Sequence, residues 1–404
     1  MKVIIFIENN QHGGLDTFCT SLVNYWPNDN DSFIIICNSS HPGAKSLQNR
    51  ISKNCKFLFH NIPLSWEYSK KIFFFIPDSI SRFFQPLLRI IFFPIQAKLI
   101  RNIFLRNLAD ELIVVNGGYP GGETCRIANI VWTSIGRKPG IHNYHNFAVT
   151  PRFGVGWYEN WLDRKVKKST KLFVSVSRAC SDSLHQRKTF ETLENNRYVY
   201  NGVQIFDKLP SHTMFDLRKK LKIGDSSLCL MLGNYETRKG HKFIFDVFNE
   251  VLKELPDVHL VTCGGGTNNE ISKVNALKNK ILPSGQVHIL GFIPDGASLI
   301  SQSDLLLIGS QEFESFGLTA LEAMVRAVPV ISTDIGGLPE VIGVDESCGY
   351  IIDHKDKIKY SKKVIETLKD KQLRISLGSS GKKRAAELFN VTEMSQKYYE
   401  FLRE

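Results

Sequence analysis

Short runs of apolar residues alternate along this chain with longer stretches in which apolar residues recur at helical spacing. Five runs in the first half have the length and composition of buried strands, at residues 3–7, 33–37, 112–115, 172–175 and 198–200. Five more follow in the second half, at residues 228–232, 259–263, 287–290, 305–308 and 328–332. Strands that alternate with helices in this way predict an α/β fold with parallel sheets.

A polar, charged stretch without a strand pattern lies between the two series, at residues 206–222. A chain of 404 residues exceeds what one hydrophobic core usually holds. We therefore expect two doubly wound domains, at residues 1–206 and 223–386, joined by this stretch. In open parallel sheets ligands bind beyond the carboxyl ends of the strands, so two such domains that face each other predict a ligand in a central cleft.

Composition and charge narrow the choice of partner. The net charge of +11 favours an anionic partner such as nucleic acid, a phosphate-bearing substrate or an acidic lipid surface. No recognised nucleic-acid-binding module is present, so nucleic acid is not expected.

Eight cysteines are scattered without a C-x-x-C pair, which is typical of free thiols in a reducing compartment. The opening "MKVIIFIENN" is too short for a signal-peptide core, and no uncharged run approaches the ~18 residues of a membrane-spanning helix. These features predict a cytoplasmic protein.

Two glycines follow the first expected strand. Gly13 and Gly14, in "NNQHGGLDTF", precede a probable helix at residues 16–26. Glycine lets a phosphate approach the backbone and meet the N–H groups of a helix N-terminus. The G-x-G-x-x-G pattern is absent, which counts against a nicotinamide dinucleotide. The alternative is that the pair only makes a tight turn.

The second half carries the stronger chemical candidates. Arg238 and Lys239 follow the strand at residues 228–232 and are suited to neutralise a diphosphate, unless they form a solvated pair. In "EFESFGLTALEAM" seven residues separate Glu314 from Glu322, and a helix begins near Leu318. Glu322 is suited to bind a ribose diol, and Glu314 to reach a sugar; the alternative for Glu322 is an exposed helical carboxylate. Backbone amides around the helix start are further candidates for phosphate binding, from Phe316, Gly317, Leu318 and Thr319.

Taken in order, these motifs resemble a known family. The order is Gly13-Gly14, "YNGV", "GNYETRKG", "GFIPD" and E-x7-E followed by "GGLPEVI". It resembles the retaining, nucleotide-sugar-dependent glycosyltransferases of family 4, which have the GT-B fold of two Rossmann-like domains. The resemblance covers nearly the whole chain and is strongest at residues 228–342. It implies that residues 387–404 form a helix that returns to the first domain.

The resemblance also implies roles for single residues. Glu322 would bind the donor ribose, Glu314 would contact the transferred sugar near the reacting carbon, and Lys239 would bind the diphosphate with help from Gly14. His145 matches the histidine near the donor sugar, and Asn146-Phe147 favours it over His142. Asn234 stands where the family usually has arginine; Arg238 could replace that cation from a different backbone position.

The expected reaction needs no cofactor besides the sugar donor. Breaking the bond between sugar and diphosphate places negative charge on the leaving phosphate, which Lys239 and the helix amides would stabilise. No Asp-x-Asp motif is placed to hold Mg²⁺ in the cleft, so a metal-independent reaction is expected. Whether Glu314 acts as a nucleophile or as a positioning group is left open. A nucleotide-sugar epimerase and a non-catalytic subunit of a transferase complex remain as alternatives.

A basic, aromatic segment at residues 70–110 suggests where the acceptor lies. It has seven Lys or Arg against two Asp, 7 − 2 = +5. Apolar residues recur at helical spacing (Phe83, Phe84, Leu87, Leu88, Ile91, Ile95), opposite Arg82, Gln85 and Arg89. Pro77, Pro86 and Pro94 are expected to break it into short pieces that dock on an anionic membrane. The alternative is a helix packed on the first sheet. Residues 163–171 extend this basic surface or form a solvated helix face.

Docking there would place the enzyme on the inner face of the cell membrane. A glycan or lipid-linked acceptor, as in the biosynthesis of bacterial surface polysaccharides, fits that location.

Overall fold

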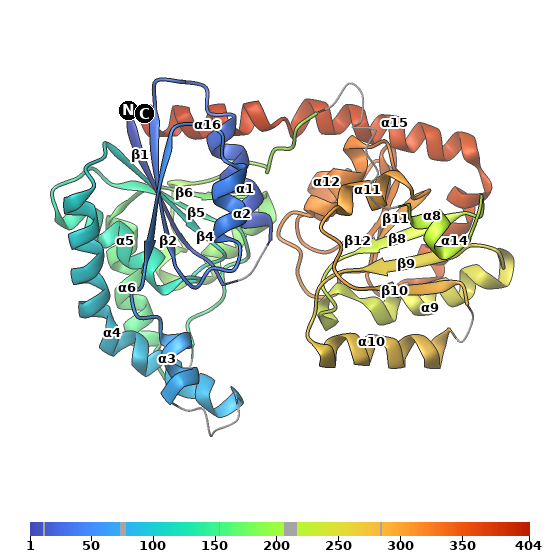
Figure 1. Cartoon of the computed structure of the whole chain (residues 1–404), viewed down its shortest axis with the longest axis horizontal. Helices are drawn as coiled ribbons and strands as arrows, with labels where there is room; N and C mark the ends of the chain where they lie inside the picture. The colour runs from blue at the N-terminus through green and yellow to red at the C-terminus, as the bar shows by residue number, and fades with distance from the viewer. Residues whose placement is uncertain (11–12, 73–77, 153, 206–215, 283–284) are drawn as a thin grey trace. The chain divides into compact units, whose positions relative to one another are not determined.

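The computed structural model describes residues 1–10, 13–72, 78–152, 154–205, 216–282 and 285–404. The chain divides into two compact units (Figure 1), the first Met1–Gly202 with Val391–Glu404 and the second Val203–Asn390. The expected connection at residues 206–222 is only partly described: residues 206–215 lie outside the described part. Helix α8, Leu217–Leu221, belongs to the second unit. The division thus falls a few residues before the expected stretch.

The first unit contains a seven-stranded sheet in the order β3-β2-β1-β4-β5-β6-β7, with every neighbouring pair parallel. Its strands are β1 Lys2–Glu8, β2 Ser32–Asn38, β3 Cys55–His60, β4 Glu111–Asn116, β5 Gly140–Tyr144, β6 Thr170–Ser175 and β7 Asn196–Tyr198. Its helices are α1 Gly14–Asn24, α2 Ala44–Arg50, α3 Ser65–Ile72, α4 Asp78–Arg106, α5 Glu123–Ser134, α6 Gly156–Lys168, α7 Arg178–Ser183 and α16 Val391–Arg403, with 3₁₀ turns Leu184–Gln186 and Lys188–Phe190.

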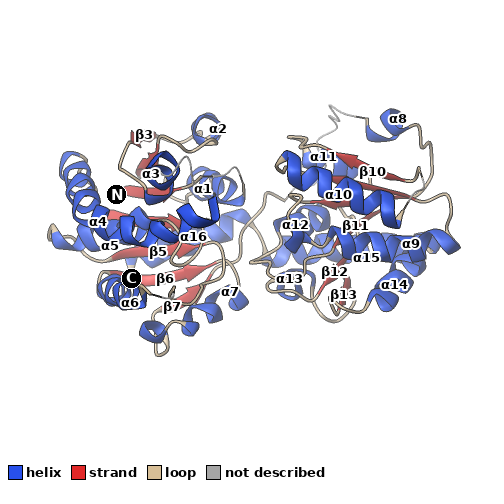
Figure 2. Ribbon diagram, turned by 90° about the horizontal axis from the view of Figure 1, so that it is seen from below, coloured by secondary structure: helices blue, strands red, loops and turns tan. Residues whose placement is uncertain are grey.

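Alternation along the central strand β1 explains why this sheet is covered on both faces. Val3, Ile5 and Ile7 point into a core shared with α1 and with the terminal helix α16. Ile4 and Phe6 point into a second core on the other side, which α4 and α5 close. Since side chains of a strand alternate between faces, an unbroken apolar strand requires helices on both sides. Figure 2 shows strands between two layers of helices in each unit.

The second unit repeats this architecture with a six-stranded parallel sheet in the order β10-β9-β8-β11-β12-β13. Its strands are β8 Leu228–Leu232, β9 His259–Cys263, β10 Val287–Leu290, β11 Leu305–Ile308, β12 Val330–Thr333 and β13 Gly349–Ile352. Its helices, besides α8, are α9 His241–Glu254, α10 Asn268–Ile281, α11 Gly296–Ser301, α12 Leu318–Val325, α13 Leu338–Ile342, α14 Lys357–Lys369 and α15 Lys371–Leu388, with a 3₁₀ turn Thr237–Lys239.

The structure confirms the predicted parallel α/β architecture and corrects several elements. Strands β3, β5 and β13 were not predicted, and β7 lies two residues before its expected position. All eight cysteines are free, as expected. The terminal helix begins at Val391 and not at residue 387, because α15 occupies the residues up to Leu388.

The prediction that prolines break the segment at residues 70–110 into short pieces was wrong for two of them. Pro86 and Pro94 lie inside the single helix α4. Pro77 and the side chains of Lys70, Lys71, Arg82, Phe83 and Phe84 lie outside the described residues. A proline removes one helical hydrogen bond, and burial of Ile100 and Phe104 in the core with α5 offsets that loss.

Residues 163–171 are neither a continuous basic surface nor a fully solvated face. They form the end of α6 and the start of β6, and Asp163 and Val166 point into the interior while Arg164, Lys165 and Lys168 are exposed. In the part of the chain that the structure describes, no helix combines the length and hydropathy needed to cross a bilayer.

Candidate functional site

Lys239 is positioned by a turn at the carboxyl end of strand β8. The 3₁₀ turn Thr237–Lys239 ends at Gly240, which has φ +74°. A Cβ atom on Gly240 would lie 1.8 Å from the carbonyl oxygen of Gly309, so only glycine allows this turn to approach the loop after β11. That close approach brings Lys239 beside the loop that carries Glu314.

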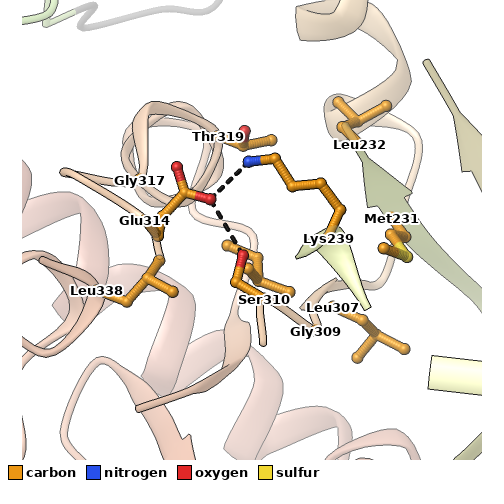
Figure 3. A pocket seen from close by; sticks show the side chains of 11 residues that line it. Met231, Leu232, Lys239, Leu307, Gly309, Ser310, Glu314, Gly317, Thr319 and Leu338 are labelled. Carbon is orange, nitrogen blue, oxygen red and sulfur yellow. Dashed lines mark hydrogen bonds and ion pairs between the residues drawn. The ribbon is translucent and has the colours of Figure 1, made fainter. Parts of the chain in front are cut away.

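The two charged side chains meet in an ion pair. Lys239 Nζ lies 2.5 Å from Glu314 Oε2, and both side chains are largely buried. The Ser310 hydroxyl donates to the same carboxylate oxygen at 3.0 Å. The hydroxyl of Thr333, from β12, in turn donates to the Ser310 carbonyl at 2.7 Å. Figure 3 shows Lys239 and Ser310 converging on Glu314. The carboxylate is therefore held from two elements.

Helix α12 begins beside this ion pair. Its N-cap, Gly317, has φ +100°, and a Cβ there would meet the Leu338 side chain at 2.7 Å. Phe316 is buried against Phe389, with ring centroids 5.7 Å apart, so its side chain anchors the loop. The first-turn N–H groups of a helix lack partners within the helix and attract anions. The start of α12 thus adds a second electropositive element next to Lys239.

A small pocket lies between these elements. Its walls include Lys239, Ser310, Glu314, Gly317 and Thr319, and its volume is about 10 Å³. A volume of that size holds about one water molecule. An anion larger than a water molecule therefore requires side chains around this pocket to move.

A larger pocket of about 320 Å³ lies at the carboxyl ends of β8 and β9. Asn234 and Glu322 line it, together with the loops at residues 263–265 and 292–297. A Cβ on Gly264 would lie 1.9 Å from the Gly233 carbonyl oxygen, so glycine is needed for these two loops to run so close. The volume suits a small organic ligand such as a nucleoside.

Glu322 lines the larger pocket one helical turn beyond Thr319, which lines the smaller one. It follows Thr319 by three residues on α12, so the two side chains lie on one helix face, and Leu232 lines both pockets. Burial raises the pKa of Glu322, and the nearby Arg326 opposes that rise. Arg326 donates its hydrogen bond to the Glu322 carbonyl, at 2.9 Å, and not to the carboxylate. The carboxylate is therefore oriented toward the pocket and suited to accept two hydroxyl groups.

Arg238, the cation expected to compensate for Asn234, interacts with groups outside both pockets. Arg238 Nε pairs with Glu236, and its guanidinium lies 4.6 Å from the Phe313 ring centroid. Asn234 also donates to Glu236, at 3.2 Å. Burial alone raises the pKa of Glu236, but the hydrogen bonds and charges of Arg238, Asn234 and Lys239 together outweigh burial, and the pKa is lowered. Arg238 lines neither pocket, so Lys239 supplies the positive side chain at the smaller one.

In the first unit, His145 follows strand β5 directly and packs on helix α1. Its ring lies edge-on to Phe18, with centroids 4.4 Å apart, and its buried Nε2 has no hydrogen-bond partner among the described residues. Burial lowers the pKa of His145 to about 3, so the ring is neutral at physiological pH. His142, by contrast, is enclosed in the core and bonded to Asn129 at 2.6 Å.

Gly13 and Gly14 lie where helix α1 begins, in the same unit as His145. Gly13 is the N-cap, with an extended backbone, and Gly14 is the first helical residue. Both are exposed, whereas Leu15 and Asp16 are buried and the Asp16 N–H donates to the Gly13 carbonyl at 3.1 Å. A carboxylate already lies in this turn, however: Asp16 is buried and pairs with His41 at 2.9 Å. Phe18 brings α1 and His145 together.

The site also contains residues that the sequence analysis missed. These are Ser310, Thr333, Gly264 and Phe292, of which Phe292 is largely exposed at the rim of the larger pocket. The run of three glycines at residues 264–266, directly after a predicted strand, was a signal that could have found one of them. Within the described ranges one group of possible metal ligands lies together, Asp334, Asp353 and His354, and it lines neither pocket.

Comparison with known proteins gives this geometry a context. Residues 214–384 match the family model of "Glycosyl transferases group 1", and this range holds every second-unit residue of the candidate site. The chain is 29% identical over 224 residues to N-acetyl-alpha-D-glucosaminyl L-malate synthase of Bacillus anthracis, covering 54% of this chain and 58% of that protein. It is 27% identical over 165 residues to the lipopolysaccharide core biosynthesis mannosyltransferase LpsB of Rhizobium meliloti, covering 40% and 47%.

The fold of the entire chain has a counterpart among solved structures. Anabaena HepE in complex with UDP and glucose superposes with a TM-score of 0.75 at 15% identity, over 100% of this chain and 99% of that one. This likeness confirms the predicted GT-B fold. The chain spans about half the length of the two curated relatives just described.

Proposed function

We propose that this protein is a retaining glycosyltransferase that moves a sugar from a nucleoside-diphosphate donor to a glycan or lipid-linked acceptor. One observation carries the proposal. The Lys239–Glu314 ion pair lies at the start of α12, and Glu322 lies one turn farther along the same helix face, in a pocket of nucleoside size. In a sugar nucleotide the diphosphate lies next to the ribose. Lys239 and the amides at the start of α12 are suited to bind the diphosphate, and the carboxylate of Glu322 is suited to bind the ribose diol.

Each donor group then has a partner in the second unit. The base and ribose occupy the larger pocket, with the ribose hydroxyls on Glu322 and the base beside Phe292. The diphosphate lies on Lys239 and on the first-turn amides of Leu318 and Thr319. Because the smaller pocket holds only about one water molecule, donor binding draws Lys239 away from Glu314, and Ser310 keeps the carboxylate in place. The freed carboxylate then faces the transferred sugar.

The reaction follows from these positions. The bond between the anomeric carbon and the β-phosphate oxygen breaks, and the nucleoside diphosphate leaves with its new negative charge next to Lys239. The acceptor hydroxyl oxygen bonds to the anomeric carbon on the side from which the phosphate departs, and its proton passes to the leaving phosphate oxygen. The configuration is then retained, with Glu314 as a positioning group. Gly14 and His145 are proposed to contact the donor, His145 as a neutral ring.

The comparisons support parts of this proposal. The HepE structure contains UDP and glucose, which favours a UDP-sugar as donor. LpsB acts in lipopolysaccharide core biosynthesis, which favours an acceptor of bacterial surface polysaccharide at the inner face of the membrane. We also propose that the reaction does not depend on a metal ion, because Lys239 and the first-turn amides of α12 are placed to supply the positive charge beside the diphosphate.

A donor screen tests the proposal. The protein is incubated with a panel of nucleotide sugars, and thermal stabilisation and release of nucleoside diphosphate are measured. We expect one donor to raise the melting temperature and to be turned over. Lys239→Ala and Glu314→Ala should each lower turnover by about 10²–10³-fold, the usual effect of losing one group that stabilises a transition state.

Two neighbouring residues provide matched controls. Glu312 is exposed two residues before Glu314, and Lys242 is exposed three residues after Lys239 and pairs with Asp246. Glu312→Ala and Lys242→Ala should leave turnover within about twofold of the unsubstituted protein. Turnover that survives in Lys239→Ala and Glu314→Ala would refute the assigned site. Donor binding without turnover would indicate a non-catalytic subunit, and an altered donor sugar without transfer would indicate an epimerase.

A further inference from the structure

Helix α4 carries an exposed apolar row on the side that faces away from the sheet. Leu87, Ile91, Ile95 and Leu99 follow one another at four-residue spacing, with exposed fractions of 51%, 60%, 47% and 37%. Residues four apart lie on one helix face, so these side chains form a continuous stripe. We call these four residues the outer face of α4. The opposite side of the helix is buried through Gln96, Ile100 and Phe104.

The outer face shares Leu87, Ile91 and Ile95 with the apolar face that the sequence predicted, but Leu88 is half-buried. Phe92, next to Ile91, packs against Tyr68, with ring centroids 5.1 Å apart. The alternative of a helix packed on the first sheet is therefore correct for the inner side of α4. The outer side remains apolar without a described partner, which a helix that only completes the core does not need.

The charges beside the outer face all have one sign. Lys98, Arg101 and Arg106 are exposed on the same half of the helix. From residue 85 to residue 107 the chain has no Asp or Glu. The fourth cation of this stretch, Arg89, is turned inward to Glu123 and Ser65. An apolar stripe flanked only by cations complements a surface that is apolar inside and anionic outside.

A groove continues the outer face toward the edge of the sheet. It has a volume of about 550 Å³ and lies between α4 and β3, the edge strand. Leu99 belongs to both the outer face and the groove, and Phe59 adds an exposed aromatic ring from β3. Arg106 and Asn102 line its polar side. Apolar and cationic groups therefore remain mixed along the whole surface, from Leu87 to the groove.

We infer that the outer face of α4 and the adjoining groove dock on the headgroup region of an anionic lipid bilayer. Charge decides between this partner and a second copy of the chain. A symmetric contact through the outer face of α4 would place Lys98, Arg101 and Arg106 of two copies together, and residues 85–107 contain no Asp or Glu to neutralise them. Anionic headgroups neutralise all three while the apolar stripe enters the interface. The inference deepens the proposed function, because it keeps the transferase next to a lipid-linked acceptor.

Co-sedimentation with vesicles tests this surface. The full chain is mixed with vesicles of phosphatidylcholine alone or of phosphatidylcholine with phosphatidylglycerol. We expect binding to the anionic vesicles and little to the neutral ones. Leu87→Ser/Ile91→Ser/Ile95→Ser should reduce partitioning to anionic vesicles at least tenfold. Lys98→Gln/Arg101→Gln/Arg106→Gln should remove the preference for anionic lipid.

The second unit offers a matched control. Ile358 and Ile375 are as exposed as the outer-face residues, so Ile358→Ser/Ile375→Ser removes a similar apolar area elsewhere. This variant should bind vesicles like the unsubstituted protein. Melting temperature and donor turnover in lipid-free buffer, measured on the same samples, exclude unfolding. If a variant loses vesicle binding but keeps its turnover, the loss is assigned to the docking face alone. If the unsubstituted protein binds vesicles but does not turn over a donor, the proposed function alone is contradicted.

Three results would overturn the inference. The unsubstituted protein could fail to bind anionic vesicles. The triple serine variant could bind as well as the unsubstituted protein. Size-exclusion chromatography could show a dimer that the triple serine variant converts to a monomer, in which case a second copy covers α4.

Discussion

Arg187 Nε lies 2.7 Å from Asp163 Oδ2 in the interior of the first unit, and both side chains are fully buried. Arg187 also reaches Glu159 at 2.9 Å, and the Tyr119 hydroxyl donates to Asp163 at 2.8 Å. Arg126, 3.7 Å from Asp163, adds a second buried cation. Asp163 therefore balances two guanidinium groups in a region without solvent.

Asp163→Ala should destabilise the protein strongly, because Arg126 then loses its ion pair with Asp163 and Arg187 keeps Glu159 but loses its shorter bond to Asp163. Removal of one partner of a buried ion pair costs about 3–5 kcal/mol. Urea denaturation followed by circular dichroism measures the loss. Asp182 is exposed on α7, and Asp182→Ala should change the free energy of unfolding by less than about 0.5 kcal/mol. Equal stability of the two variants would contradict a structural role for the buried network.

Replacement of Glu322 should raise stability while it lowers donor affinity. Burial raises the pKa of this carboxyl, so its ionised form is unfavourable in the folded protein and costs stability above that pKa. Glu322→Gln should therefore have a higher melting temperature than the unsubstituted protein at pH 7. The difference should shrink as the pH falls toward the ordinary glutamate range, because Glu322 itself then becomes neutral.

The same variant should bind the donor at least tenfold more weakly, with a rise in KM larger than the fall in kcat, since Glu322 is proposed to bind ribose in ground state and transition state alike. Scanning calorimetry at several pH values and steady-state kinetics measure the two effects. A Glu322→Gln protein that is less stable and binds donor normally would mean that the carboxylate has a structural role instead.

Buried histidines should make the first unit sensitive to acid. Burial lowers the pKa of His142 to about 3 and that of His60 to about 4, against an unfolded value near 6.5. Both rings are neutral in the folded protein, whereas the unfolded chain takes up protons as the pH falls through 6.5. Their stabilising contribution is thus complete above pH 6.5 and is lost as the pH falls toward 4 and 3.

The free energy of unfolding should accordingly be lower at pH 5 than at pH 7. In His142→Gln the loss between these two pH values should be smaller by about 2 kcal/mol, the linkage expected for one histidine. Urea titrations at both pH values give the comparison. An unchanged pH dependence in His142→Gln would contradict the neutral, enclosed ring that the structure places beside Asn129.

Much of the fold could be predicted because its strands are short apolar runs, and four of the second-unit strands match their predicted bounds. Strand β5 was missed because His142 and Asn143 interrupt its apolar pattern. Asn143 is buried nonetheless, since it bonds to the Val174 carbonyl and to the Tyr398 hydroxyl. Strand β13 was missed because it begins at Gly349, and glycine usually indicates a turn. When a residue is buried by contacts with a distant part of the chain, the sequence around it has no pattern that predicts its burial.

Some residues of the candidate site could likewise be predicted from the sequence, and others could not. Glu314 and Lys239, 75 residues apart, could each be predicted as a site residue because each stands in a motif with a chemical reason for its residue type. Their direct ion pair was not predicted. Ser310 could not be found, because its role depends on where β12 and the loop after β11 place its hydroxyl. The uninterrupted α4 was also beyond the sequence, since local proline chemistry argued against it and tertiary packing outweighed that preference.

The position of helix α16 in the sequence affects the order in which the two units can fold during synthesis. Met394, Tyr398 and Leu402 complete the same core as Val3 and Ile5, so the sheet of the first unit lacks part of its covering until residues 391–403 emerge from the ribosome. The second unit, by contrast, is continuous in sequence and can close its own core first. During synthesis the first unit therefore stays incomplete and aggregation-prone while the whole second unit is made, and we expect chaperones to bind it during that interval.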